Sequence, residues 1–188
     1  MKVFDREQLQ EGDILAGRNL DPEDRIAQGI QILLGSYTNH NALFIKKDGM
    51  FRIGDTTPPR SQVVLLRKYE RLINQGLYIV RVWRVVGMTP SIGERISKIW
   101  LEQCQEVDYP ELQVLRLWTM RFLNSLPYEV KGRWCTKNTL IPFSYFPGLD
   151  PRINPDGKMK LNPTPRTMEN RLVSGVLIDV TDKVLVEV

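Results

Sequence analysis

Three side chains of this sequence have the types needed for a nucleophile, a base and the group that orients the base. Cys135 lies in the stretch GRWCTKNTL, at the expected start of a short helix with basic neighbours. A thiolate is a strong nucleophile, and its pKa falls at a helix N-terminus or beside an imidazolium. His40 is the only histidine, so it is the only candidate for that imidazole. Asp55 is the carboxylate available to orient the ring.

Residue types alone leave a structural interpretation open. A lone histidine and a small cysteine are common in protein cores, so Cys135 by itself fits a packing role equally well. The second cysteine, Cys104, falls on the apolar face of an expected helix, and we assign it to the core. A disulfide between the two cysteines is disfavoured because such bonds are rare in reducing compartments.

A hairpin predicted over residues 40–57 brings the imidazole and the carboxylate together. The segment HNALFIKKDGMFRIGDTT contains two apolar, strand-like runs on either side of Asp48 and Gly49. The Asp-Gly pair is a strong signal for a hairpin turn. His40 begins the first expected strand and Asp55 ends the second. Pairing of the strands therefore places these two side chains next to each other.

Two helices have recognisable start signals. The segment DPEDRIAQGIQILLGS predicts a helix in which Asp21 caps the N-terminus, Pro22 takes the first position and Gly35 ends the last turn. In TPSIGERISKIWLEQCQEV, Ser91 and Glu94 have the spacing of a capping box. The apolar residues that follow recur at helical intervals and include Cys104.

The remaining patterns predict an α+β protein with one mainly antiparallel sheet packed against helices, in a single domain over residues 1–188. Strands are expected at 9–18, 77–85, 175–180 and 183–188, and helices at 109–127 and from Cys135 to Pro142. Residues 143–166 are rich in proline and glycine and predict an irregular, exposed loop that serves as a lid or as the rim of a cleft.

Composition narrows the functional classes. The chain has 188 residues, 42% hydrophobic and 26% charged, which is typical of a globular protein with a sizeable core. Neither an apolar leader nor a run of 18 apolar residues is present, so we expect a cytoplasmic protein without a membrane span. The net charge is +4, but the basic residues are scattered among acidic ones, which argues against a nucleic-acid partner. Two cysteines and one histidine exclude the usual zinc clusters, and no cofactor is expected.

The order of the motifs resembles the circularly permuted papain-like fold of the NlpC superfamily, and its YiiX-like members in particular. The segments EGDILAGR, GSYTNHNALFI, DGMFRIGDTTPP and LPYEVKGRWCTKNTL follow one another along the chain. Members of this family have a GDI strand, a helix, a strand that carries the catalytic histidine, an acidic segment and then a cysteine on a helix. The later NPTPRTM is similar to the C-terminal part of the family.

The resemblance implies that Cys135 is the nucleophile, that His40 is the general base and that Asp55 orients His40. Two places depart from the family pattern. After the nucleophile stand Thr136, Lys137 and Asn138, so a lysine replaces the common glutamate. After His40 stand an asparagine and an alanine, where a glycine is common. No catalytic group is lost, but both departures leave the substrate class open.

The resemblance implies a cysteine hydrolase that acts on an amide bond of a peptide or acyl-amide substrate, as a peptidase or a peptide amidase, including one for cell-wall peptides. Trp134 and Tyr37 are expected to line the cleft, with packing in the core or at a sheet edge as their alternatives. Tyr128 and Asn138 are further polar candidates. A thioesterase or acyltransferase of the lecithin retinol acyltransferase-like type and a non-catalytic binding scaffold remain alternative functions. The oligomeric state is not predicted.

Overall fold

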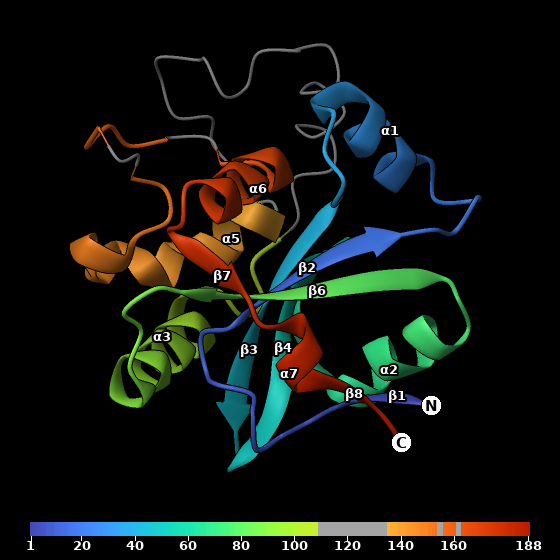
Figure 1. The fold of residues 1–188 in the computed structure, drawn as a ribbon, viewed down its shortest axis with the longest axis horizontal. Coiled ribbons are helices and arrows are strands. Elements are labelled where there is room, and N and C mark those ends of the chain that lie inside the picture. The colour runs from blue at the N-terminus through green and yellow to red at the C-terminus, as the bar shows by residue number, and fades with distance from the viewer. Residues whose placement is uncertain (109–134, 154–155, 161–162) are drawn as a thin grey trace.

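A six-stranded antiparallel sheet forms the centre of the computed structural model, which describes residues 1–108, 135–153, 156–160 and 163–188 (Figure 1). Its strands lie in the order β5-β4-β3-β2-β6-β7, and each neighbouring pair is antiparallel. Their bounds are β2 (Ile14–Asn19), β3 (His40–Lys47), β4 (Met50–Thr57), β5 (Arg60–Leu65), β6 (Tyr78–Val85) and β7 (Leu177–Asp179). The predicted α+β architecture with a mainly antiparallel sheet is confirmed.

A second, two-stranded sheet joins the two ends of the chain. It pairs β1 (Lys2–Phe4) with β8 (Leu185–Glu187), so the termini lie side by side in Figure 1. The sequence patterns indicated a single sheet that included the last strand. The short α7 (Thr181–Val184) between β7 and β8 turns the chain away from the main sheet instead.

Helices cover both faces of the main sheet (Figure 1). On one face lie α3 (Pro90–Gln103), α5 (Cys135–Leu140) and α6 (Pro165–Val173), together with the 3₁₀ helices η2 (Ile141–Tyr145) and η3 (Pro147–Leu149). On the other lie α2 (Leu66–Asn74), α7 and the β1–β8 pair. Helix α1 (Arg25–Leu34) connects β2 to β3. No helix in the described parts of the chain is long and apolar enough to cross a membrane.

The two faces of β3 belong to two separate cores because successive side chains of a strand point in opposite directions. Ala42 and Phe44 pack with the apolar side chains of α2 and β1. Leu43 and Ile45 pack on the opposite face with Trp100 and the other apolar residues of α3, α5 and α6. A strand buried on both faces holds its backbone in place, and it therefore fixes the residues at its ends.

The β3–β4 hairpin has the turn predicted from the Asp-Gly pair. Asp48 and Gly49 both have positive φ angles, 53° and 72°, as a two-residue turn of the primed type requires. The register pairs Lys47 with Met50 and continues to Leu43 opposite Gly54. This part of the fold is confirmed.

The predicted start of α1 is wrong by one turn. The N-terminal cap is Asp24, whose Oδ1 accepts a hydrogen bond from the backbone N–H of Ala27 at 2.9 Å. The predicted cap, Asp21, instead accepts from the backbone N–H of Glu23, in the turn that precedes the helix. Gly35 ends α1 in the left-handed conformation, with φ of 56°, as predicted.

Residues at two other helix starts also differ from the expectation. The cap of α3 is Thr89, which accepts from the N–H of Ile92, so the capping box expected at Ser91 is not formed. In α6 a capping box joins Thr164 and Thr167 within the region expected to be an irregular loop. The described part of that region is exposed only in part: Phe143 is buried in the core, whereas Tyr145 is 53% exposed. The helix expected at 109–127 lies outside the described residues.

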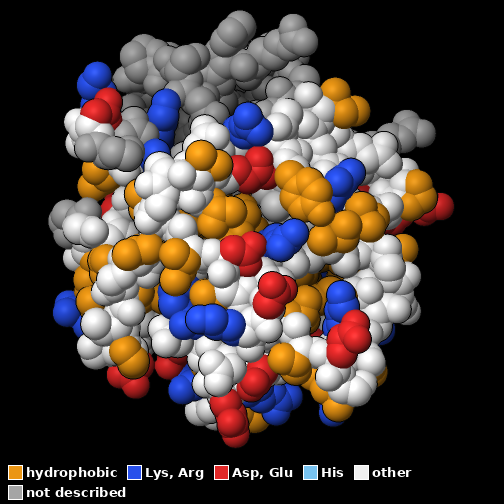
Figure 2. Space-filling model, in the orientation of Figure 1, with side chains coloured by type: hydrophobic (Ala, Val, Ile, Leu, Met, Phe, Trp, Pro, Cys, Tyr) orange, Lys and Arg blue, Asp and Glu red, His pale blue; other side chains and the backbone are white. Residues whose placement is uncertain are grey.

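Basic and acidic side chains are intermixed on the surface. On the face seen in Figure 2, the coloured lysine and arginine side chains stand between aspartates and glutamates and form no continuous basic stripe. Several of these charges pair with each other, among them Arg81 with Asp179 at 3.5 Å.

Candidate active site

The hairpin places His40 against Asp55. Asp55 follows Gly54, which pairs with Leu43, so its side chain shares a face with that of His40. Nε2 of His40 lies 2.8 Å from Oδ1 of Asp55. The His40 side chain is 11% exposed and that of Asp55 is fully buried. The two strand ends therefore form a close, desolvated pair.

Helix α5 brings Cys135 to the same place from the opposite face of the sheet. The hydroxyl of Thr136 donates to Oδ1 of Asn41 at 2.9 Å, and that of Thr139 donates to the Asn41 carbonyl at 3.1 Å. Asn138 donates through Nδ2 to the hydroxyl of Thr56 at 2.8 Å. The helix is thus attached to the residues that follow His40 and Asp55 in the chain.

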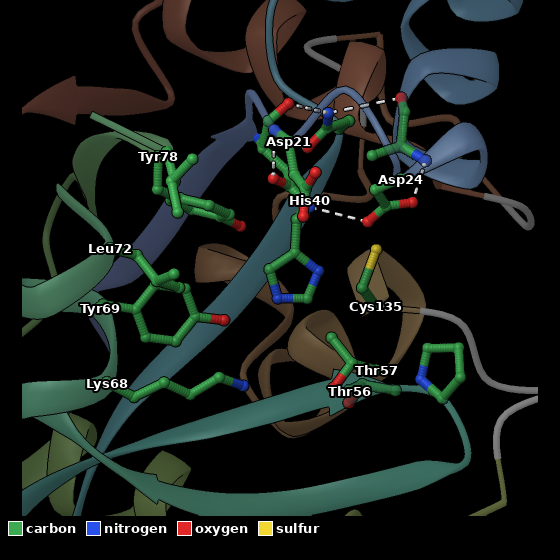
Figure 3. Close-up of a pocket in the computed structure, with 15 residues that line it drawn as sticks. Asp21, Asp24, His40, Thr56, Thr57, Lys68, Tyr69, Leu72, Tyr78 and Cys135 are labelled. Atoms are coloured by element: carbon green, nitrogen blue, oxygen red, sulfur yellow. Dashed lines mark hydrogen bonds between the residues drawn. The ribbon is translucent and has the colours of Figure 1, made fainter. Parts of the chain in front are cut away.

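This attachment sets Cys135 beside the imidazole. Cys135 and His40 line the same cavity, and the imidazole acts electrostatically on the thiol. In Figure 3 the sulfur points into the space beside the His40 ring rather than back into α5. The side chain is 4% exposed, and neither cysteine forms a disulfide.

Charge interactions favour the thiolate and the imidazolium over their neutral forms. Burial alone lowers the pKa of His40, but the charge and hydrogen bond of Asp55, aided by Cys135, raise it from 6.5 to about 10. Burial alone also raises the pKa of the Cys135 thiol. The hydrogen bond and positive charge of His40 outweigh burial and lower the pKa of Cys135 below its ordinary value of 9.0. The arrangement therefore favours an ion pair between the two side chains.

A cavity of about 220 Å³ opens beside this pair (Figure 3). Cys135 and His40 line it together with Thr56 and Thr57 of β4. Apolar and aromatic residues also line the cavity: Ala27, Tyr69, Leu72, Leu77 and Tyr78. Two aspartates from the connection between β2 and α1, Asp21 and Asp24, line it as well. A small group bound in the cavity would therefore meet the thiol directly.

A structural comparison finds the same fold in a bacterial protein. The crystal structure of metalloprotein yiiX from Escherichia coli O157:H7 superimposes with a TM-score of 0.55. The match covers 88% of this chain and 82% of that chain at 13% sequence identity. The fold resembles that of YiiX. No protein-family model and no curated protein matches the sequence.

The YiiX-like order of elements was predicted from the motifs, and one of the two departures noted there makes contacts in the structure. Asn41, which follows His40, accepts a hydrogen bond from the hydroxyl of Thr136 through its side chain. Its backbone carbonyl accepts from the hydroxyl of Thr139. Asn41 therefore joins β3 to α5. Asn138, expected as a polar contributor in the cleft, instead holds α5 to β4.

One expected substrate contact, Tyr37, is not part of the described cavity. Tyr37 is 46% exposed, and the guanidinium of Arg18 lies 5.1 Å from the centre of its ring. It is not among the described residues that line the cavity, although Asn39 and His40, which follow it closely, are. Trp134 and Tyr128 lie outside the described residues.

Helix α2 contributes two polar groups that the sequence interpretation missed. Nζ of Lys68 lies 2.8 Å from Oδ2 of Asp55, and the ring of Tyr69 lines the cavity beside it. The signal was present in the sequence, since Leu66, Tyr69 and Ile73 recur at helical spacing in LRKYERLIN. Because no helix was assigned to this segment, its side chains were not considered for the site.

Proposed function

We propose that this protein is a cysteine hydrolase that cleaves an amide bond, with Cys135 as nucleophile, His40 as general base and acid, and Asp55 as the group that orients His40. The observation that carries the proposal is the buried His40–Asp55 pair, whose imidazole shares one cavity with the Cys135 thiol. A nucleophile joined to a base that is itself held by a third group is the general pattern of covalent catalysis.

The chain order supports a permuted papain-like arrangement. In papain-like proteases the cysteine comes first and its histidine follows far downstream. Here His40 and Asp55 precede Cys135, while the cysteine still begins a helix and the histidine still begins a strand. The same elements joined in a different order account for both features, as the resemblance to the NlpC superfamily implies.

The reaction follows from the ion pair. The Cys135 thiolate attacks the carbonyl carbon of the substrate, and the first backbone N–H groups of α5, which have no acceptor within the helix, stabilise the oxyanion. The imidazolium of His40 then gives its proton to the amide nitrogen as the C–N bond breaks and the amine departs. A thioester remains on Cys135. Water, deprotonated by His40, attacks this thioester, releases the carboxylic acid and restores the thiol.

A metal ion has no part in this proposal. The described residues contain no group of three or more His, Cys, Asp or Glu side chains that fits a metal ion. Asp55 is already held by His40 and Lys68, so its two oxygens are engaged in ion pairs.

The proposal is tested by a panel of reporter substrates that contrasts peptide amides with long-chain thioesters. We expect the full-length protein to release amine from an amide substrate, and we expect the Cys135→Ala and His40→Ala variants to lose this activity. Cleavage that persists in Cys135→Ala would contradict the proposal. Cleavage of the thioesters but not of the amides would favour the thioesterase or acyltransferase alternative. If the folded wild-type protein cleaves neither class of substrate, a binding scaffold would be favoured.

A further inference from the structure

The Asp55 carboxylate holds a cation on each of its oxygens. Oδ1 lies 2.8 Å from Nε2 of His40, and Oδ2 lies 2.8 Å from Nζ of Lys68. Asp55 is fully buried, whereas the side chain of Lys68 is 36% exposed. A lysine that reaches inward to a buried carboxylate next to a reactive histidine needs a physical explanation.

Helix α2 fixes the position from which Lys68 reaches the carboxylate. Leu66 and Tyr69 are buried in the core against the sheet. The far end of the helix is fixed by Asn74, which accepts from the N–H of Lys2 at 2.8 Å and donates to its carbonyl at 2.7 Å. The backbone of Lys68 is therefore anchored, and its side chain extends from a rigid element.

Stability alone gives little reason for this ion pair. A charge that is partly exposed gains little from its ion pair because water screens it. The consequence at the buried partner is larger, since a buried carboxylate that loses a charged partner is left with incomplete compensation. The effect of Lys68 is thus concentrated on Asp55 and on the groups that Asp55 contacts.

We propose that Lys68 is a positioning residue of the catalytic site, which keeps Asp55 ionised and its Oδ1 directed at His40. This inference rests on the proposed function, because it assigns a role within the same triad. Four groups then stand in a row with alternating charge: the Cys135 thiolate, the His40 imidazolium, the Asp55 carboxylate and the Lys68 ammonium. Each charge is stabilised by its neighbours, and loss of the last one weakens the series.

Two phenols and two carboxylates also face the series. Tyr69 on α2 and Tyr78 on β6 both line the cavity, with their ring centroids 5.3 Å apart. Burial, followed by the charge of Asp55, raises the pKa of both phenols well above 10, so both stay neutral over the range studied below. Across the cavity stand Asp21 and Asp24, whose negative charges are on the side away from Lys68 (Figure 3). Among the described residues that line the cavity, Lys68 is the one lysine or arginine.

The test is the pH profile of Cys135 alkylation by iodoacetamide, followed on the Cys135 peptide by mass spectrometry. Lys68→Met removes the cation and keeps most of the side-chain length. Lys68→Gln removes the charge but keeps a hydrogen-bond donor, and Lys68→Arg keeps both. Lys98→Met is the matched control, because Lys98 forms only an exposed i,i+4 pair with Glu102 on α3.

We expect the acid limb of the profile to move up by roughly half to one pH unit in Lys68→Met and Lys68→Gln. In Lys68→Arg and Lys98→Met we expect it to stay at the wild-type position. A profile in Lys68→Met and Lys68→Gln that matches the wild type, even with a lower melting temperature, would overturn the proposal, since only a structural role would then remain. An equal shift in Lys68→Arg would overturn it as well.

Alkylation separates this inference from the proposed function because it requires no substrate. A protein that hydrolyses no amide but shows the Lys68 shift retains the positioning role and loses the assigned reaction. A protein that hydrolyses amides without any Lys68 shift retains the reaction and loses the positioning role.

Discussion

Nε2 of His40 and Oδ1 of Asp55 lie 2.8 Å apart in a site from which water is largely excluded. The attraction between these two groups, which overcomes the opposing effect of burial, raises the pKa of His40. Nδ1 remains for the thiol, since Nε2 is engaged with the carboxylate. The relationship therefore links the reactivity of Cys135 to a residue that the thiol does not touch.

Replacement of Asp55 by asparagine keeps the shape of this contact and removes its charge. Burial then dominates, the pKa of His40 falls, and the ion pair with Cys135 is lost at neutral and mildly acidic pH. We expect Asp55→Asn to slow the alkylation of Cys135 at pH 6 by roughly ten- to a hundredfold, since each pKa unit is a factor of ten. Asp182→Asn, at an exposed position of α7, is the control. Unchanged alkylation in Asp55→Asn would show that Asp55 does not tune His40.

The ion pair also predicts how stability depends on pH. The pKa of His40 is raised from 6.5 to about 10 on folding, so its contribution to stability is full below pH 6.5 and is lost as the pH rises towards 10. The pKa of Cys135 is lowered from 9.0, so its contribution is present above pH 9 and is lost as the pH falls. Between pH 6.5 and 9 the folded pair and the unfolded pair each hold one proton. The two dependences therefore offset each other there.

Cys135→Ala removes the pH dependence that comes from the thiol and leaves that of His40 unbalanced. His40 stays charged in the folded variant through Asp55 but is neutral in the unfolded chain above pH 6.5. We expect the free energy of unfolding of the variant, measured with urea, to fall by about 1.4 kcal/mol per pH unit above pH 6.5. The wild type should be nearly flat up to pH 9, and so should the double variant with His40→Ala. A flat profile in Cys135→Ala alone would mean that His40 is neutral in the folded protein.

Local sequence patterns were sufficient for the hairpin and insufficient for the contacts that complete the site. The turn at Asp48 and Gly49 and the apolar runs around it determine the register, and the register places His40 next to Asp55. The docking of α5 depends instead on hydrogen bonds between residues 95 positions apart, Thr136 and Asn41. The spacing of apolar residues along the sequence does not predict a hydrogen bond between residues so far apart. Sequence reasoning reached Cys135 through a family resemblance, and it missed Lys68 because its helix was not assigned.

Asn138 is expected to control the placement of Cys135. Its Nδ2 donates to the Thr56 hydroxyl at 2.8 Å and to the Cys104 carbonyl at 3.1 Å, both in a buried setting. Asn138→Ala leaves these acceptors without this donor, so we expect a loss of about 1 to 3 kcal/mol in the free energy of unfolding. Alkylation of Cys135 at pH 6 should slow as well, because α5 loses its attachment to β4. Asn170→Ala, at an exposed site on α6, should change neither quantity. A variant that is destabilised but alkylated at the wild-type rate would limit Asn138 to a structural role.

Glu169 on α6 is expected to fix the segment that leads into His40. Its Oε1 accepts hydrogen bonds from the Ser36 hydroxyl at 2.8 Å, from the Thr38 backbone N–H at 2.7 Å and from the Thr38 hydroxyl at 2.9 Å. Hydrogen bonds to a charged acceptor contribute more than neutral ones, so Glu169→Ala should lower the free energy of unfolding by roughly 2 to 3 kcal/mol. Glu169→Gln keeps an acceptor oxygen and should lose less.

The control for these Glu169 hydrogen bonds is Glu94→Ala, at an exposed position of α3. Urea unfolding of the three variants at pH 7 gives the stabilities, and alkylation of Cys135 at pH 6 reports on the site. Because Thr38 lies two residues before His40, we expect Glu169→Ala to slow alkylation while Glu94→Ala does not. Equal stabilities for the two alanine variants would show that α6 does not hold this segment, and the alignment of His40 would then depend on the β3–β4 hairpin alone.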